Sequence, residues 1–325
     1  MPDRIQITIV GLGLIGTSFG LALKRHKRTD LFIVGHDKEP QAMAAAKERG
    51  AVDGSHWNLV AACAQADGIL LALPAAAIPP TLEAICQDLK PGCFLMDTAT
   101  IKTPILEAAR VLPAHVHFIG GNPILTRSDL RTAADATADL FENVAWALCP
   151  TSATLPEAVE AAADLVTLVG AKPFFLDAAE HDGLMAAVEG LPILLAAALT
   201  NALGGSPGWR ELRRLAGGRF ETASALPVGE PGDMSADLAA NRGNVLRWLD
   251  LLIAQLEGWR QDLAAADDAS LADRFVQADA LRREWLAARA SGEFEDRPPP
   301  TELPSYWSRF FGRAAFGLAS RRPGR

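Results

Sequence analysis

Three glycines near the N-terminus have the spacing of a phosphate-binding turn. Gly11, Gly13 and Gly16 form the pattern G-x-G-x-x-G. Residues 5–10 are mostly β-branched and largely apolar, which predicts a buried strand, and residues 17–24 read as a helix. In such a turn the first glycine permits the bend, the second lets a pyrophosphate approach and the third lets the helix pack closely. The helix start adds free N–H groups and a positive dipole end.

A carboxylate follows at the distance that a dinucleotide site requires. Asp37 lies just after a second apolar strand, residues 31–35, and about 20 residues beyond the glycines. A carboxylate there accepts both ribose hydroxyls of NAD and repels the 2′-phosphate of NADP, so we predict NAD. A solvated loop aspartate is the alternative for this residue. Nearby basic residues leave NADP open as a second cofactor: Arg25, Lys27, Arg28 and Lys38.

Further polar residues come directly after later strands. The predicted strand 93–96 is followed by Asp97-Thr98-Ala99-Thr100-Ile101-Lys102, and strand 116–119 by Gly120-Gly121-Asn122-Pro123. Pro74 ends a third strand, residues 68–73. Alternating strands and helices predict a parallel sheet with right-handed crossovers, in which ligands bind at the carboxyl ends of the strands. We therefore expect these segments, the glycine turn and Asp37 on one rim.

The periodicity changes near Asp177. Before it, strands are expected at 144–148 and 172–176 around a helix at 156–169; after it the sequence reads only as helices, at 181–203, 207–215, 233–264 and 270–290. We predict an α/β fold: a Rossmann-type NAD-binding domain (1–177), then an all-helical domain (178–290). The helix at 233–264 carries an apolar stripe that predicts packing within the subunit or across a dimer: Leu246, Leu249, Ile253 and Leu256.

Residues 291–325 are Pro-rich and charged, and are predicted to be a linker or tail. Residues 306–318 within it read as an amphipathic helix, which we expect to dock on its own protein; membrane-surface contact is the alternative.

Composition limits the classes of partner and compartment. The 325 residues are 49% hydrophobic and carry a net charge of -8, which disfavours a general nucleic-acid binder. The four cysteines show no ligand spacing and are expected to be buried thiols, and the histidines predict no metal site. The first residues lead directly into a strand, and no apolar run reaches the ~18 residues of a membrane span. A cytoplasmic protein without membrane or nucleic-acid partners is expected.

Taken together, these motifs resemble the prephenate/arogenate dehydrogenase family of tyrosine biosynthesis, over residues 5–290. The resemblance rests on GLGLIG at 11–16, Asp37, DTATIK at 97–102, GGNPI at 120–124, and His181-Asp182 with Leu191-Pro192. It implies a helical dimerisation domain, hence a homodimer. It also implies an oxidative decarboxylation, in which a hydride leaves the hydroxyl-bearing ring carbon for the nicotinamide and loss of carbon dioxide makes the ring aromatic.

The chain departs from the family at positions that carry the chemistry. The family has G-G-H-P, whose histidine takes the hydroxyl proton or hydrogen bond; Asn122 stands there and cannot accept a proton. A serine that contacts substrate and nicotinamide corresponds to Thr100, so a hydroxyl remains. A second histidine, of S-H-L-P, corresponds to Gly190. The substrate-binding arginine aligns near Ser224, with two other basic residues as alternative charges: Arg214 and Arg219.

Thr100 and Asn122 are the predicted catalytic residues, although a helix cap and a turn are their structural alternatives. Lys102 is expected to be a surface lysine, with a role in orienting the rim as the alternative. His181 is expected to start a helix beside Asp182, with general-base chemistry as the alternative. The predicted cofactor-binding residues are Gly11, Leu12, Gly13, Leu14, Ile15, Gly16, Asp37, Leu73, Pro74 and Thr98.

The predicted function is an NAD-dependent oxidation of a small molecule, prephenate or arogenate. Two alternatives remain open. One is a catalytically impaired NAD-binding regulator, because the family's histidines are absent. The other is a dehydrogenase of a different hydroxy acid, although such enzymes use a lysine on the first helix after the nucleotide domain and residues 181–203 contain none.

Overall fold

The computed structural model describes residues 4–127, 130, 132–226 and 230–291, so the predicted tail and its helix at 306–318 lie outside the described residues. The chain divides into two compact units. Of the described residues, the sheet unit comprises 4–127, 130, 132–185, 226 and 230–240, and the helical unit comprises 186–225 and 241–291. Residues 178–185 and 230–240 therefore group with the sheet, beyond the boundary predicted at Asp177.

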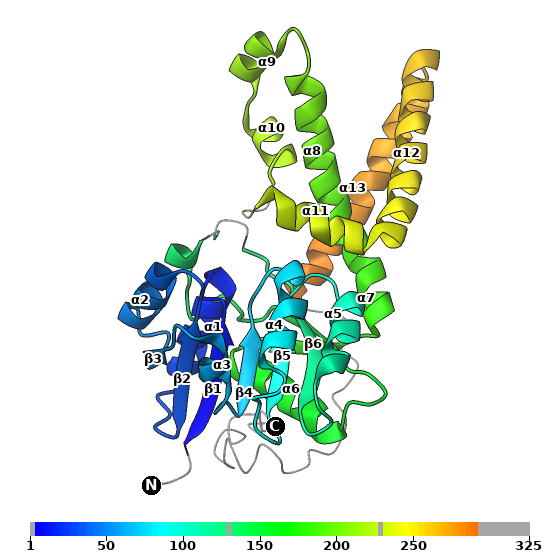
Figure 1. The fold of residues 1–325 in the computed structure, drawn as a ribbon. Helices are drawn as coiled ribbons and strands as arrows, with labels where there is room; N and C mark the ends of the chain where they lie inside the picture. Colours follow the sequence, from blue (N-terminus) through cyan, green and yellow to red (C-terminus); the bar gives the residue numbers. More distant parts are fainter. Residues whose placement is uncertain (1–3, 128–129, 131, 227–229, 292–325) are drawn as a thin grey trace, which may run out of the picture. The chain divides into compact units, whose positions relative to one another are not determined.

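The sheet unit is built on eight strands in the order β3-β2-β1-β4-β5-β6-β7-β8. Strands β1 to β6 are labelled in Figure 1. All neighbours are parallel except β6 and β7, which are antiparallel. The order reverses between β1 and β4, the point at which doubly wound sheets bind ligands. The predicted α/β class is confirmed. The strands are β1 (Ile5–Val10), β2 (Leu31–His36), β3 (Gly54–Ser55), β4 (Gly68–Leu71), β5 (Phe94–Asp97), β6 (His117–Pro123), β7 (Ala145–Cys149) and β8 (Lys172–Phe175).

Two hydrophobic cores lie on opposite faces of this sheet. In β4, Leu70 packs into one core, and Ile69 and Leu71 pack into the other, as the alternation of side chains along a strand requires. Helices α1 (Leu14–Lys24), α2 (Pro40–Glu48) and α6 (Pro156–Leu168) supply the first core. Helices α3 (Leu59–Cys63), α4 (Ile78–Ile85) and α5 (Thr103–Ala108) supply the second.

The four cysteines are buried and free, as predicted. Burial raises the pKa of Cys63 and of Cys149 to about 12, so these thiols are unreactive near neutral pH.

Strand β6 is longer than the sequence suggests. The segment Gly120–Pro123 was expected to follow the fifth strand as part of the rim, but it is the second half of β6 and pairs with β7. Two adjacent glycines disfavour a strand in isolation, and only the pairing with β7 reveals this one. Asn122, opposite Ala147, is therefore held by a strand rather than by a turn.

The helical unit departs from the predicted pattern at one main point. The stretch 233–264, expected to be one helix, divides at Asn241 into α11 (Pro231–Ala240) and α12 (Arg242–Ala265), and α11 belongs to the sheet unit. The helical unit also contains α8 (Leu191–Gly204), α9 (Trp209–Leu215), α10 (Gly218–Ala223) and α13 (Asp268–Ser291), with a π-helical turn, η4 (Ala186–Gly190), before α8. Helix α7 (Ala178–Met185) groups with the sheet unit.

One helix is long and apolar enough to cross a membrane by length and composition. The residues from Ala178 to Gly204 form a continuous helix with a mean hydropathy of 1.8 in its most apolar window, of which 22% is buried. The expectation that no stretch is long enough is therefore wrong by this criterion, because the helix continues through Glu189, which interrupts the apolar run. A single such helix is weak evidence for a membrane, since core helices of soluble proteins also have this character.

Steric constraints account for two of the three glycines in the first turn. Gly11 has φ +93°, and a Cβ there would lie 2.2 Å from the carbonyl oxygen of Ala72. A Cβ on Gly16 would lie 1.9 Å from the carbonyl oxygen of Gly11. A Cβ on Gly13 would meet no atom within 4 Å. The fold therefore requires glycine at the first and third positions, whereas the space beside the second is left open.

Substitutions at Gly16 and Gly13 should therefore have different effects on folding and on dinucleotide binding. Gly16→Ala should destabilise the protein by about 1–3 kcal/mol, because the added methyl collides with backbone. Gly13→Ala should cost less than about 1 kcal/mol, because it only weakens a helix cap, yet it should still impair dinucleotide binding. Thermal unfolding and NAD titration of both variants check this. Equal losses of stability would contradict the steric account.

Candidate functional site

The glycine turn and Asp37 are joined by hydrogen bonds at the carboxyl ends of β1 and β2. One Asp37 carboxylate oxygen accepts from the Leu12 N–H at 2.7 Å, and the other accepts from the Glu39 N–H at 2.9 Å. No side chain caps the start of α1, so the N–H groups of its first turn, including those of Leu14 and Ile15, remain available to a phosphate. The structure thus brings six of the predicted cofactor residues and Asp37 to one place.

The basic residues considered for NADP are partly engaged elsewhere. Arg25 pairs with Glu142, and Arg28 pairs with Asp30 at 2.5 Å. Lys38 is exposed beside Asp37.

The remaining predicted cofactor residues lie after β4 and β5. The Thr98 N–H donates to the Leu71 carbonyl oxygen at 3.2 Å, so the loops after the two strands run side by side. Leu73 and Pro74 continue the chain after β4 and lead into a short 3-10 turn, η1 (Ala75–Ala77). A Cβ on Gly11 would lie 3.1 Å from Leu73, which places these residues next to the glycine turn at the point where the strand order reverses.

A buried ion pair connects the end of β5 to β6. Lys102 and Asp97 are completely buried and paired with each other, and the Lys102 ammonium group also donates to the Gly121 carbonyl oxygen at 2.7 Å. Asp97 accepts in turn from the Gly121 and Ala99 N–H groups, at 3.0 and 2.9 Å. The expectation of a surface lysine is therefore wrong. The pattern D-x-x-x-x-K after a strand does not by itself show that both charges turn inward.

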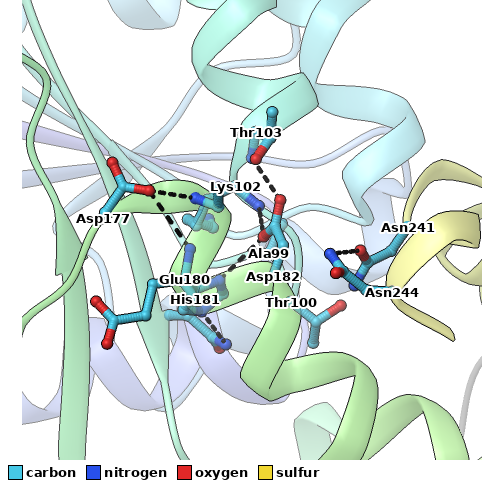
Figure 2. A network of polar contacts seen from close by, with 12 residues as sticks. Ala99, Thr100, Lys102, Thr103, Asp177, Glu180, His181, Asp182, Asn241 and Asn244 are labelled. Carbon is cyan, nitrogen blue, oxygen red and sulfur yellow. Dashed lines mark hydrogen bonds and ion pairs between the residues drawn. The ribbon is translucent and has the colours of Figure 1, made fainter. Parts of the chain in front are cut away.

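Asp182 fixes the loop that carries Thr100. Its carboxylate accepts from the Lys102 N–H at 2.6 Å and from the Thr103 N–H at 2.8 Å, and so caps α5 from another helix (Figure 2). Burial raises the pKa of Asp182, but hydrogen bonds from His181, Thr103 and the backbone outweigh it, so this pKa lies below its ordinary value. The carboxylate is therefore ionised and can only accept.

This charge determines how His181 and Asn122 face each other. His181 is buried, with Nδ1 3.1 Å from Asp182 and Nε2 3.1 Å from the Asn122 side-chain nitrogen. Because the carboxylate only accepts, Nδ1 carries the proton; in the neutral ring Nε2 then accepts from the Asn122 NH₂ group. The Asn122 carbonyl oxygen is left without a hydrogen-bond partner among the described residues. His181 does lie beside Asp182 near a helix start, as expected, but it also contacts a predicted site residue.

Thr100 has a partner that the sequence does not indicate. Its hydroxyl donates to the Asp237 carboxylate at 3.1 Å, and Asp237 lies on α11, 137 residues further along the chain. The sequence does not point to Asp237, because residues 233–264 read as one helix of a separate domain. The signal that could have located it is the helix break at Asn241.

The other residues considered for substrate binding belong to the helical unit. Gly190 ends the π-helical turn before α8. Ser224 donates to the Phe220 carbonyl oxygen of its own helix at 2.7 Å. Arg214 and Arg219 are exposed on α9 and α10.

The strand order, the uncapped glycine turn and the carboxylate after β2 define a dinucleotide-binding α/β protein with a helical unit. Two family models match it in sequence order: "Prephenate dehydrogenase, nucleotide-binding domain" over residues 19–174, and "Prephenate dehydrogenase, dimerization domain" over residues 177–277. The chain belongs to the prephenate dehydrogenase family.

Individual relatives agree. A prephenate dehydrogenase of Lactococcus lactis is 36% identical over 200 residues, which are 60% of this chain and 52% of that protein. The match thus spans about half the length of this relative. A prephenate dehydrogenase of Bacillus subtilis is 27% identical over 88% of this chain and 77% of its own length. The crystal structure of Synechocystis arogenate dehydrogenase superposes with a TM-score of 0.71 at 27% identity, covering 86% of this chain and all of that one.

The buried ion pair can be tested by removing one charge. Lys102→Met keeps a long side chain but leaves Asp97 buried without its cation, so we expect a loss of about 3–5 kcal/mol in the free energy of unfolding. Denaturant unfolding measures this. Arg110→Met, in the exposed Arg110–Glu107 pair, is the control and should be nearly neutral. Similar behaviour of the two variants would show that the buried pair is not structural.

Proposed function

We propose that this protein oxidises and decarboxylates prephenate or arogenate with NAD as the hydride acceptor. The observation that carries the proposal is the site at the rim of the sheet, where the dinucleotide turn, Thr100 and the loops after β4 and β5 meet in a chain whose two regions both match the prephenate dehydrogenase models. The named relatives are dehydrogenases, which supports an enzyme rather than a regulator.

The cofactor side of the proposal fits the residues present. The open space at Gly13 admits a pyrophosphate, the first turn of α1 offers its N–H groups, and Asp37 offers a carboxylate to a ribose. The negative charge of Asp37, and the engagement of Arg25 and Arg28 in ion pairs, favour NAD over NADP. When bound, NAD supplies the hydride acceptor.

The substrate side rests on two groups. Thr100 presents a hydroxyl oxygen that still has lone pairs free to accept, and Asn122 presents a carbonyl oxygen without a partner among the described residues. Both are hydrogen-bond acceptors for a substrate hydroxyl. Their role is to hold that hydroxyl so that its carbon faces the cofactor, because positioning accounts for a large part of the rate in such reactions.

The activity has a direct test. Protein incubated with NAD and either prephenate or arogenate should form NADH together with 4-hydroxyphenylpyruvate or tyrosine, followed by absorbance and chromatography. Gly13→Ala is the matched control, because it should fold and bind NAD poorly. Absence of turnover with both substrates, in folded protein that binds NAD, would contradict the proposal and favour a regulator or a different hydroxy acid.

Asp37 should determine the choice of cofactor. Asp37→Asn keeps an oxygen for the Leu12 N–H but removes the charge, so the ratio of NAD to NADP affinity should fall about 10- to 100-fold, the size expected for lost charge-assisted hydrogen bonds. Fluorescence titration with both cofactors measures it. Glu39→Gln, at an exposed neighbouring residue, should leave the ratio unchanged. An unchanged ratio in the Asp37 variant would place the ribose elsewhere.

We also infer a cytoplasmic homodimer formed through the helical unit. The family model for residues 177–277 is described as a dimerization domain. Within one chain the stripe predicted on α12 is not buried: Leu246 is 50% exposed, Ile253 44% and Leu256 53%. A second copy that covers these side chains would remove this apolar surface from water. Sedimentation of the purified protein tests this.

A further inference from the structure

Helix α11 places the carboxylate of Asp237 against the hydroxyl group of Thr100, one of the two residues proposed to contact the substrate. It packs on η1, which directly follows Leu73 and Pro74 at the rim of the sheet. From this helix Asp237 accepts the Thr100 hydroxyl at 3.1 Å, and both residues are partly buried. A helix distant in sequence therefore contributes a charged group to the rim of the same unit.

The direction of this hydrogen bond matters for chemistry. An ionised carboxylate can only accept, so the Thr100 proton points toward Asp237. The lone pairs of the Thr100 oxygen are then directed to whatever approaches from the site. A substrate hydroxyl that donates to this oxygen would complete a chain from substrate through Thr100 to the carboxylate.

Other ionisable groups near the loop are already engaged. Both ring nitrogens of His181 have partners, in Asp182 and Asn122. Lys102 and Asp97 are paired with each other in the interior. Two described residues have side chains that hydrogen-bond Thr100 or Asn122, namely Asp237 and His181. Of these, Asp237 can receive a proton without losing a contact between His181 and its two partners.

We propose that Asp237, acting through Thr100, is the group that takes up the proton of the substrate hydroxyl during oxidation. The inference rests on the proposed function. As the C–H bond of the carbinol carbon breaks and its electron pair leaves as hydride to NAD, the hydroxyl proton passes to the Thr100 oxygen and the Thr100 proton passes to Asp237. Loss of carbon dioxide then leaves its bonding pair in the ring, and the proton returns to the oxygen of the aromatic product. Asp237 does not contact the substrate in this proposal; it orients the Thr100 hydroxyl and holds the proton that Thr100 passes to it.

The charges around Asp237 suit this role. Burial and the neighbouring Asp233 raise its pKa, while the Thr100 hydrogen bond and Lys102 lower it, and the balance lies above the ordinary value. The packed element η1 contributes three alanines. Because a base is most effective with a pKa near the working pH, an upward shift favours proton uptake. Below this pKa the group is protonated and cannot accept, so the rate should fall as the pH falls through it.

The experiment compares the pH dependence of kcat and KM in full-length variants that are checked for folding by thermal unfolding. Asp237→Asn should lower kcat about 10²- to 10⁴-fold, with KM and NAD affinity little changed, and should abolish the acid limb of the profile. Thr100→Val should behave similarly, whereas Thr100→Ser should retain activity. Asn122→Ala should lower the rate but keep the acid limb. Glu83→Gln, at an exposed residue of α4, is the control.

A second readout does not depend on activity. In protein labelled with ¹³C at the aspartate carboxyl carbon, one resonance should titrate above the usual range, disappear in Asp237→Asn, and move to still higher pH in Thr100→Val, because the lost hydrogen bond had lowered its pKa.

The inference is overturned if Asp237→Asn keeps the wild-type rate and acid limb, or if Thr100→Val leaves the Asp237 titration unmoved. If wild-type protein binds NAD but oxidises neither substrate, the proposed function fails; the titration then supports or overturns the pairing of Thr100 with Asp237 by itself.

Discussion

The buried pair of Asp97 and Lys102 is the interaction on which the geometry of the site depends. Two charges removed from water are tolerated only with further hydrogen bonds, and here Gly121 supplies both an acceptor and a donor while Ala99 supplies another donor. The pair thereby joins the end of β5, the following loop and the middle of β6. Thr100 lies inside that loop, and Asn122 follows Gly121, so one electrostatic contact sets the separation of both candidate substrate groups.

A second set of polar residues, Asp182 and His181, orients the loop and the Asn122 side chain that the buried ion pair positions. Asp182 caps the start of α5 from α7 and fixes the ring proton of His181, and the imidazole then dictates which end of the Asn122 amide faces away from it. An asparagine amide can be placed in two ways that differ only in the exchange of oxygen and nitrogen. When the His181 ring is neutral, the carboxylate of Asp182 removes that ambiguity, because it fixes the proton on Nδ1 and leaves Nε2 as an acceptor. A side chain that cannot accept a proton thus becomes a defined hydrogen-bond acceptor.

Much of the nucleotide half could be predicted from sequence because its signals are local. The turn at Gly11 to Gly16, its strand and its helix are marked by residues that are adjacent in the sequence. The sequence predictions are wrong where contacts between residues far apart in the chain determine the structure. Gly120 to Pro123 becomes a strand only because β7 pairs with it, Lys102 turns inward only because Asp97 and Gly121 meet it, and Asp237 reaches Thr100 only because the chain breaks its helix at Asn241.

Asn122 stands where the family that the motifs resemble has a histidine, and this difference separates two tasks that one imidazole can perform. Holding a hydroxyl requires an acceptor of fixed direction, and the Asp182–His181–Asn122 arrangement provides one. Receiving the proton requires a group that can change charge, and Asp237 behind Thr100 is such a group. Oxidation with loss of carbon dioxide makes moderate demands on the second task, since aromatisation of the ring drives the reaction forward. In the proposed mechanism a carboxylate acting through a hydroxyl therefore takes the place of the imidazole as proton acceptor, and this requires α11 to hold Asp237 beside Thr100.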